Sequence, residues 1–333
     1  MSEQTESARG GRARRQEGNL IGTSTAARAL LEQIAIAGRE RYPLWIYGEE
    51  GVERDLVGRL IHEASAWANG AFSVLDISAV PGNLARRELF GAETGAIQGL
   101  PSSHDGVLAR SRQGTLLLDG IEGLSKDLQE EIAHLLASGR FRRLGGQSDV
   151  TVECRVIGSG STPLDTEVRA GQLIRTLADR LGTFEIRIPP LRERPEDVPL
   201  IAAQALAEIR EEVESHTGRP CPVRALSNAA QQRLVSYDWP RNERELREQI
   251  RAAVGLARSD EIQPSDFVLG WSSPDGVPSF REAKRSFERE YVTRLLRLCH
   301  GNISQAARLA QKDRKDFYDV MRRNAINPPD FRS

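Results

Sequence analysis

The fold of this chain is decided by residues 44–60, which read LWIYGEEGVERDLVGRL. The stretch opens with an apolar run at 44–47, which predicts a short buried strand. A glycine-containing loop follows at 48–53, and apolar residues then recur on one helical face, at Leu56, Val57, Leu60 and Ile61. A strand, a glycine loop and a helix in this order are the local structure in which phosphate-binding loops occur.

The loop has the length of a phosphate-binding loop but not its side chains. The pattern G-x-x-x-x-G-K-[ST] surrounds the phosphates with backbone N–H groups and a lysine. Gly48 is the first glycine, whereas Glu53 replaces the second, Arg54 the lysine and Asp55 the hydroxyl residue. Two like charges about 4 Å apart repel by ~1 kcal/mol in water and ~4 kcal/mol near a protein surface. We therefore interpret this region as a nucleotide-binding scaffold whose chemistry has decayed, because four acids crowd the loop, namely Glu49, Glu50, Glu53 and Asp55.

Length and composition indicate a globular chain with more than one domain. The chain has 333 residues, of which 39% are hydrophobic and 28% charged. The net charge is −1, but residues 278–333 contain 13 Lys and Arg against 7 Asp and Glu, a net of +6, which leaves −7 for the rest. The C-terminal part is therefore the part whose charge suits a polyanion.

The cysteines and the apolar runs indicate the cellular compartment. Cys154, Cys221 and Cys299 lie far apart without metal-ligand spacing, which favours a reducing compartment and no disulfide framework. No apolar run approaches the ~18 residues of a membrane span, so no membrane contact is expected. Arg14 and Arg15 are not followed by an apolar segment and do not form an export signal. We expect a cytoplasmic protein.

The first two thirds of the chain follow an α/β pattern. Residues 1–19 are polar and are expected to form a disordered tail, with no sensor domain before residue 20. Residues 20–190 alternate short apolar strands with amphipathic helices, which predicts a parallel sheet with helices on both faces. A helix is expected at 26–37, and strands at 44–47, 71–77, 115–118 and 155–157. Gly48 and Asp119 both follow strands, at the sheet edge where such folds bind ligands.

The remaining residues have helical patterns. Residues 191–270 lack strand patterns and predict a small helical subdomain, with helices at 199–213, 227–236 and 243–257. Residues 271–278 contain SSPDG and indicate a linker. A long helix is expected at 279–299. Two short helices are expected at 303–310, capped by Asn302 or Ser304, and at 314–323. The tight turn between them suggests a helix-turn-helix within an all-α domain at 279–333.

Five motifs strengthen this reading: ELFGAETGA at 88–96, QGTLLLDGI at 113–121, IPPLRERPEDVPLIA at 188–202, WPRNEREL at 239–246 and GNISQAARLA at 301–310. In this order they resemble the bacterial enhancer-binding proteins that activate sigma-54 RNA polymerase, which join an NtrC-type AAA+ ATPase to a Fis-type helix-turn-helix. The resemblance covers residues 20–326. It implies an AAA+ α/β subdomain at 20–190, a helical lid at 191–270, regulation of transcription, DNA as a partner, and ATP with Mg²⁺ as ligands of the core.

Two catalytic features implied by the resemblance are altered. Asp119 matches the metal-binding carboxylate, but Gly120 stands where the family has the Glu that polarises the attacking water. Loss of a general base typically lowers a rate ~10²–10⁴-fold. The polymerase-contacting loop, GAFTGA in the family, reads GAIQGL at 95–100, without the aromatic and the threonine that touch sigma-54. We therefore predict that the core has lost ATP hydrolysis and sigma-54 contact.

The other nucleotide contacts implied by the family are partly retained. Arg180 matches one of two arginines that reach a neighbouring subunit's nucleotide, while the other falls on Ile174, next to Arg175. The sensor II arginine is Arg244, and the sensor I residue lies within 158–161. The vestigial nucleotide-binding set is Gly48, Gly51, Arg54, Asp55, Asp119, Arg180 and Arg244.

Each of these residues has an alternative role. Arg54 can itself bind a phosphate, because guanidinium is a good phosphate partner. ATP with Mg²⁺ is then the expected ligand; otherwise no cofactor and no metal are expected. Asp119 either ligates Mg²⁺ or forms a structural ion pair with Arg54. Arg180 and Arg244 either contact nucleotide or form ordinary salt bridges.

The third helix of the C-terminal domain carries the candidate DNA contacts. Gln311 and Lys312 occupy turn positions where the family often has Gly and an apolar residue, and Asp316 and Asp319 would weaken phosphate contacts. The alternative is a helical protein-interaction module. The helix at 279–299 is expected to pair with its copy, because Fis-type domains dimerise. The side chains best placed to reach DNA are Arg314, Lys315, Tyr318, Arg322 and Arg323.

Three hypotheses about function remain open. The first is a DNA-binding regulator with a pseudo-ATPase core, which acts as a dimer and does not depend on an AAA+ ring. The second is a genuine ATP-dependent sigma-54 activator with unusual motifs, against which Gly120 and Ile97 argue. The third is that the emptied pocket binds another small ligand or a regulatory protein.

Overall fold

The computed structural model describes residues 20–96 and 103–269, and in the C-terminal part residues 284, 287, 288, 291–293, 295, 296, 299, 301–324 and 326. The expectations for the tail at 1–19, for most of the loop at 95–100 and for the linker at 271–278 lie outside the described residues. The chain forms two compact units, Met1–Pro264 and Ser265–Ser333. Each unit is described by itself.

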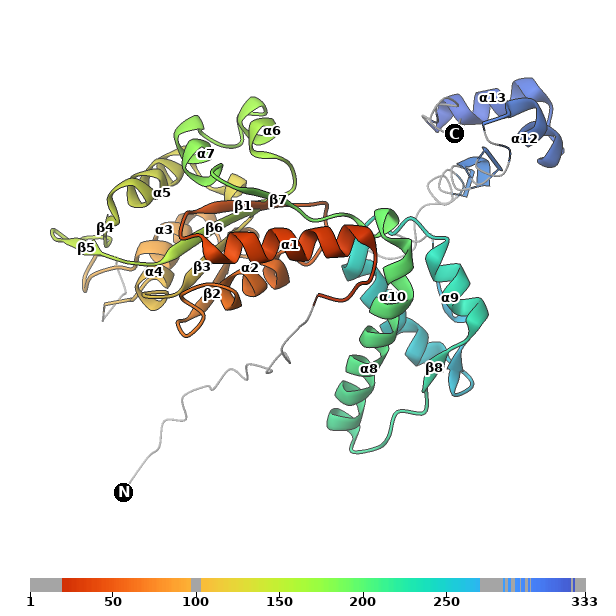
Figure 1. The fold of residues 1–333 in the computed structure, drawn as a ribbon, viewed down its shortest axis with the longest axis horizontal. Helices are drawn as coiled ribbons and strands as arrows, with labels where there is room; N and C mark the ends of the chain where they lie inside the picture. The colour runs from red at the N-terminus through yellow and green to blue at the C-terminus, as the bar shows by residue number, and fades with distance from the viewer. Residues whose placement is uncertain are drawn as a thin grey trace. The chain divides into compact units, whose positions relative to one another are not determined.

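A five-stranded parallel sheet is the centre of the first unit, with the strand order β2-β3-β6-β1-β7 (Figure 1). This confirms the predicted parallel sheet, and the predicted strands at 44–47, 71–77, 115–118 and 155–157 are all present. β6 is three residues longer than expected because its last residues, Gly-Ser-Gly, still pair with β1. The five strands are β1 (Leu44–Tyr47), β2 (Phe72–Asp76), β3 (Thr115–Asp119), β6 (Arg155–Gly160) and β7 (Glu185–Arg187).

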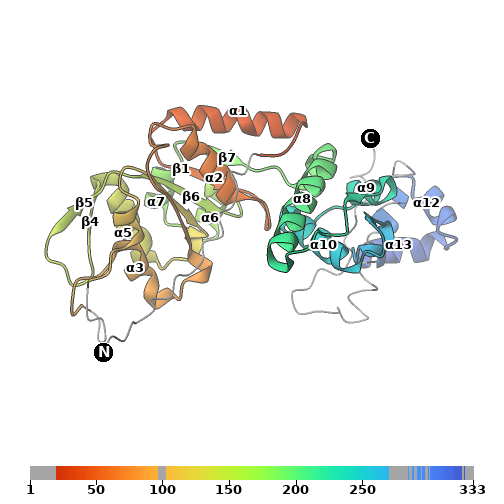
Figure 2. The ribbon, with the colours of Figure 1, turned by 90° about the horizontal axis from the view of Figure 1, so that it is seen from below.

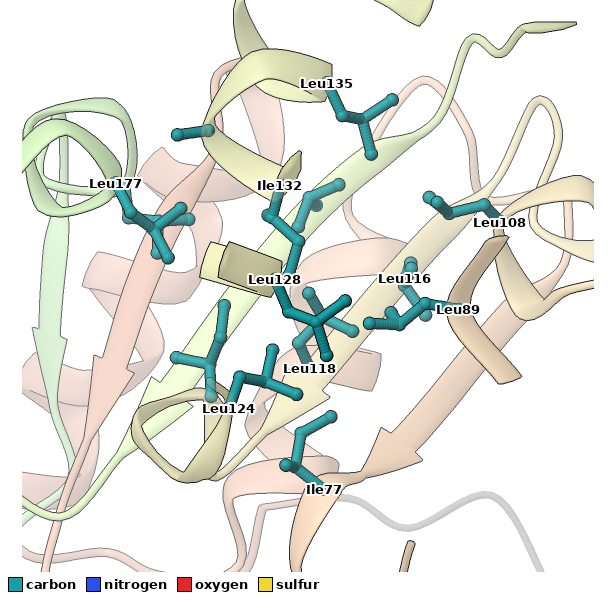
Figure 3. Packing of buried hydrophobic residues seen from close by; sticks show 14 of the residues in the cluster. Ile77, Leu89, Leu108, Leu116, Leu118, Leu124, Leu128, Ile132, Leu135 and Leu177 are labelled. Atoms are coloured by element: carbon teal, nitrogen blue, oxygen red, sulfur yellow. The ribbon is translucent and has the colours of Figure 1, made fainter. Parts of the chain in front are cut away.

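Alternate residues of each strand point to opposite faces, and helices cover both faces. On one face Leu44, Ile46 and Leu117 pack against α1 (Thr25–Arg39) and α2 (Arg54–Glu63). Their neighbours Trp45 and Leu116 point to the other face, where a larger core lies against α3, α4, α5 and α7 (Figures 2 and 3). The helices of this second face are α3 (Gly82–Phe90), α4 (Val107–Arg110), α5 (Lys126–Ser138), α6 (Leu164–Arg169) and α7 (Arg175–Leu181).

Short turns and strands complete the unit. A hairpin of β4 (Arg140–Arg142) and β5 (Asp149–Thr151) and the edge strand β7 were not predicted, because three residues are too few for a periodic pattern. The 3₁₀ turns are η1 (Ile77–Ala79), η2 (Ile121–Gly123), η3 (Leu191–Glu193), η4 (Pro195–Asp197) and η5 (Pro264–Asp266).

The helical subdomain contains the three predicted helices. They are α8 (Val198–Thr217), α9 (Asn228–Val235), which is capped by the Ser227 side chain, and α10 (Asn242–Leu256). The expectation that this region lacks strands was wrong, because β8 (Ala225–Leu226) pairs with β9 (Glu261–Ile262). This two-stranded pairing joins segments on either side of α9 and α10, so local sequence gives no sign of it. We call this subdomain the lid.

The second unit contains α12 (Ile303–Leu309) and α13 (Arg314–Arg323), separated by the predicted tight turn. The Asn302 side chain accepts a hydrogen bond from the Gln305 amide at 3.2 Å, so Asn302 and not Ser304 caps α12. Gln311 has a left-handed φ of 50°, which explains why glycine suits this turn position. Part of the predicted helix at 279–299 is described, and Val292, Leu295, Leu296 and Cys299 join the buried core of this unit.

None of the described helices combines the length and the apolar composition that crossing a membrane requires.

Candidate functional site

The glycine loop, residues 48–55, lies at the carboxyl end of β1, as the sequence predicted. The Gly48 amide donates to the Gly160 carbonyl of β6 at 3.2 Å, and α2 begins at Arg54. Gly51 has a φ of 84°, a left-handed conformation that favours glycine. The strand, the glycine loop and the helix therefore follow one another as the sequence predicted.

The Arg54 side chain turns back over the ends of the strands. Its Nε donates to Asp119 Oδ1 at 2.8 Å, and its Nη1 donates to the Gly48 carbonyl at 3.3 Å and to the Gly160 carbonyl at 3.5 Å. The Ser159 hydroxyl, one of the sensor I candidates, donates to the same Asp119 oxygen at 2.7 Å. Asp119 therefore forms the ion pair with Arg54 that was one of the two roles expected for it. The arginine thus neutralises the carboxylate that a metal ion would need.

The acids of the loop do not stand unpaired around a pocket, which corrects the picture drawn from the sequence. Glu49 forms a bidentate pair with Arg192, Glu50 lies 3.8 Å from Arg244, and Glu53 lies 3.1 Å from Arg247. The hydrogen bond from Arg192 lowers the pKa of Glu49, against an opposing effect of burial. All three arginines follow residue 190, so the lid supplies the compensating charge.

The backbone of the loop also contacts the lid directly. The Arg244 amide donates to the Gly51 carbonyl at 3.1 Å, and the Asn242 side-chain amide donates to the Glu50 carbonyl at 2.9 Å. A Cβ on Gly51 would overlap the Arg241 carbonyl oxygen. Glycine is therefore required at this position for close approach as well as for its left-handed backbone. The sensor II candidate Arg244 approaches the loop through its backbone, whereas its side chain is exposed.

A second connection joins the segment before α1 to the lid. The buried carboxylate of Asp197 accepts hydrogen bonds from the amides of Thr23 and Ser24 at 2.7 and 2.9 Å, and from the Ser24 hydroxyl at 2.6 Å. Because Ser24 also caps α1, this carboxylate fixes the start of the first helix on the start of the lid.

The residue after Asp119 is Gly120, which has no carboxylate that could polarise a water molecule. Gly120 has a left-handed φ of 73°, and a Cβ there would meet no atom within 4 Å. Two residues further, Glu122 directs a carboxylate toward the end of β6 near Gly160. Its Oε2 is buried and has no hydrogen-bond partner in the described part of the chain, and burial raises the pKa of Glu122. Sequence reasoning missed this residue, although a carboxylate two places beyond a vacated catalytic position was a visible signal.

The remaining candidates of the nucleotide set lie in different surroundings. Asp55 lies in the first turn of α2, directly after Arg54. Arg180 is exposed at the end of α7 and has no ion-pair partner among the described residues, whereas Arg175 pairs with Asp165 and Asp179. Across the described ranges no group of three or more His, Cys, Asp and Glu side chains is arranged to hold a metal ion.

The candidate DNA contacts share one exposed helix. Phe317, Val320 and Met321 bury the inner face of α13, and the Asp313 side chain caps its start by accepting from the Lys315 amide at 2.7 Å. Arg314 and Tyr318 are exposed and lie one turn apart on the outer face. Asp316 lies between them in sequence and projects from a different face. The exposed basic and aromatic set is Arg314, Lys315, Tyr318, Arg322 and Arg323.

An aromatic pair lies on the described part of the segment at 279–299. The rings of Phe287 and Tyr291 stack with centroids 5.8 Å apart, and these residues are 66% and 41% exposed. They lie outside the buried core of the second unit, which leaves an apolar surface on this segment.

The fold and the site define a nucleoside-triphosphatase-type α/β core with a helical lid, followed by a helical C-terminal unit. Residues 20–187 match the family model described as the sigma-54 interaction domain, and residues 192–273 match that of the AAA+ ATPase lid domain. The chain therefore belongs to the family of sigma-54 activator-type transcriptional regulators.

Individual relatives agree with this assignment. The chain is 32% identical over 304 residues to the transcriptional regulatory protein GlrR of Escherichia coli, covering 91% of this chain and 67% of that protein. It is 33% identical over 300 residues to the response regulator protein PilR of Pseudomonas aeruginosa, covering 87% and 66%. Among solved structures it is similar to NtrX from Brucella abortus in complex with ADP, with a TM-score of 0.69 and 26% identity over 92% of this chain and 70% of that chain. The chain spans about two thirds of the length of these curated relatives.

Proposed function

We propose that this chain is a DNA-binding transcriptional regulator of the cytoplasm whose AAA+ core no longer hydrolyses ATP. The observation that carries the proposal is the Arg54–Asp119 ion pair, with Arg54 also bonded to two carbonyls at the strand ends. The guanidinium pairs with the Asp119 carboxylate, which would have to be available to hold a phosphate-bound Mg²⁺.

The missing water-polarising carboxylate at Gly120 supports the same conclusion. Positioned bases typically contribute ~10²–10⁴-fold to a rate, and Gly120 has no side chain with which to act. The fold itself does not exclude nucleotide, because the similar structures of NtrX are complexes with ADP and ATP. The proposal therefore depends on this chain's own residues and not on its architecture.

The proposed action on transcription depends on α13. Its exposed Arg314, Lys315 and Tyr318 and the +6 charge of residues 278–333 suit a DNA duplex. The exposed pair Phe287 and Tyr291 supports a dimer formed through the segment at 279–299. Such a dimer would bind a two-fold symmetric site and would regulate by occupancy, by co-assembly or through a partner protein or small ligand, without a working AAA+ ring or contact with sigma-54.

A second candidate function is a genuine ATP-dependent sigma-54 activator. The observation that favours it is the Glu122 carboxylate, which reaches the strand ends next to Asp119 and has an unbonded, buried oxygen. In this version Glu122 would take the role of the residue missing at Gly120.

ATP turnover by the purified protein separates the two candidates. The wild type is compared with Asp119→Ala and Glu122→Gln, with fluorescent-nucleotide binding measured in parallel. The pseudo-ATPase proposal expects wild-type turnover equal to that of Asp119→Ala. Turnover on the order of 1 per second that both substitutions abolish would refute the pseudo-ATPase proposal and leave the second candidate.

A further inference from the structure

Three ion pairs between described residues join the glycine loop to the lid, and the motifs found in the sequence do not require them. Each of three loop carboxylates faces a different lid arginine, in the pairs Glu49–Arg192, Glu50–Arg244 and Glu53–Arg247. The third pair is half-buried, whereas the first and the second are exposed on both sides. The strongest candidate for a specific role is the third pair, because Glu53 stands where a phosphate-binding loop needs glycine.

Arg247 connects three elements at once. Its guanidinium contacts Glu53 at the start of α2 through Nε at 3.2 Å and Nη2 at 3.1 Å, and contacts Glu208 of α8 through Nη1. Burial opposes its charge, but the carboxylates of Glu53 and Glu208 raise the pKa of Arg247 overall. The side chain is therefore held as a cation between the loop and the lid.

Breaking this connection would also break neighbouring hydrogen bonds. The Arg244 amide to the Gly51 carbonyl and the Asn242 side chain to the Glu50 carbonyl join the same two segments. Isolated surface ion pairs contribute little, whereas several contacts between the same rigid segments must open together. In a nucleoside triphosphatase the nucleotide between core and lid provides such a connection; here protein charges provide it.

We propose that the Glu53–Arg247 pair locks the lid onto the core in the absence of nucleotide. Glu53 contributes a fixed negative charge at the loop, and Arg247 binds it as a lid arginine binds a phosphate. The biological meaning of the lock rests on the proposed loss of ATP hydrolysis, since only a core that does not cycle can remain locked. The lock itself is tested in protein purified free of nucleotide.

Hydrogen exchange of the Arg244 amide measures lid opening directly, because this amide donates to the loop. In nucleotide-free protein, Glu53→Gln and Arg247→Gln should each accelerate its exchange up to about 5-fold, the upper end of the range measured for partly exposed ion pairs. The double variant should exchange no faster than the faster single variant, because both substitutions remove the same pair. High salt should accelerate exchange more in the wild type than in the variants, which keep only the two exposed pairs of the three described between loop and lid.

Two controls make the outcome decisive. Glu212→Gln removes the Arg251–Glu212 pair, which joins α10 to α8 within the lid at 2.7 Å, and should leave the Arg244 amide unchanged. The Leu117 amide in the centre of the sheet reports global unfolding and should exchange more slowly than the Arg244 amide in all variants, which separates lid opening from unfolding. Unchanged Arg244 exchange in both single variants, multiplied effects in the double variant, or an equal effect of Glu212→Gln would overturn the lock.

The result is independent of the test of the proposed function. ATP turnover with an intact lock would refute the pseudo-ATPase proposal alone. Absence of turnover with no change in Arg244 exchange would refute the lock alone.

Discussion

At the scale of single residues, Asp119 depends on Arg54 and Ser159 for its charge compensation. Asp119→Asn should destabilise the first unit by about 1–3 kcal/mol, because it weakens a partly buried, charge-assisted network and leaves Arg54 without an anion. Urea unfolding followed by circular dichroism measures the change. Asp149→Asn, which removes the exposed pair with Arg142, is the matched control and should cause no measurable loss. Equal effects of the two substitutions would contradict this account of the site.

His62 gives a prediction about pH. It is buried in α2 with Nδ1 2.9 Å from the Thr115 hydroxyl, and burial lowers the pKa of His62 below its ordinary value of 6.5. As the pH falls below 6.5, the unfolded chain therefore takes up a proton before the folded one does. The stabilising contribution is complete above this pH and is lost below it, with a slope of up to about 1.4 kcal/mol per pH unit. The free energy of unfolding of the wild type, measured by urea titration at each pH, should show this slope, and that of His62→Gln should not. Identical pH profiles of the two proteins would argue against a buried neutral imidazole.

The sequence predicted where the residues of the candidate site lie better than it predicted which side chains they contact. Gly48 and Asp119 were expected at the carboxyl ends of strands, and they lie there because strand and loop patterns are local. The pairing of Glu53 with Arg247 spans 194 residues and depends on how the lid folds back, which no local pattern encodes. Glu122 was missed because its role depends on which way a short 3₁₀ turn directs its side chain.

At the scale of elements, the lid contains a buried ion pair between Arg194, which follows η3, and Glu243 in α10. Their side chains are 1% and 4% exposed, and burial lowers the pKa of Arg194. Glu243→Ala should cost about 3–5 kcal/mol, because it leaves a buried guanidinium without its carboxylate. Glu248→Ala removes the more exposed pair with Arg241 in the same helix and should cost less than about 1 kcal/mol. Calorimetric or urea unfolding measures the loss of unfolding free energy in the two variants. Equal losses would exclude a special role for the burial of the Arg194–Glu243 pair.

The exposed face of α13 gives the second prediction at this scale. Arg314 lies in its first turn, where base edges are usually met, and a good bidentate contact contributes ~1–3 kcal/mol. Arg314→Ala should therefore weaken specific binding about 5- to 150-fold on genomic fragments enriched by the protein itself. Asp316→Ala, on a different face of the helix, should not weaken binding. If fluorescence anisotropy shows no difference between Arg314→Ala and the wild type, α13 is a protein-interaction element.

Helices and the apolar strands β1 and β3 were predictable, whereas strands of two or three residues were not. The predicted bounds of α9 and α10 fell within one or two residues of the observed ones, and those of α13 coincided with them, because several apolar residues repeat at helical spacing. The strands of the lid, β8 and β9, have two residues each, and their pairing is set by the packing of the helices between them.

At the scale of the whole molecule, charge is divided between the two parts of the sequence. Residues 278–333 carry +6 while the remainder carries −7. DNA affinity should therefore fall steeply with salt, by about 30-fold or more between 50 and 200 mM if three or more phosphates are neutralised. Anisotropy titrations across this range measure the slope. Added ATP should leave the slope of DNA affinity against salt concentration unchanged. A DNA affinity that does not change with salt would mean that phosphate contacts do not hold the complex.

The three cysteines lie in three different regions: Cys154 directly before β6, Cys221 in the lid, and Cys299 in the core of the second unit. Cys221 and Cys299 are buried, and burial raises the pKa of the Cys154 thiol to about 11. A thiol-specific alkylating reagent attacks thiolates, so the buried Cys221 and Cys299 should react at the rates at which their own regions open, whereas the half-buried Cys154 is slowed by its raised pKa. Without any engineered label, timed alkylation followed by mass spectrometry would therefore rank the lid and the C-terminal unit by their local stability in one experiment.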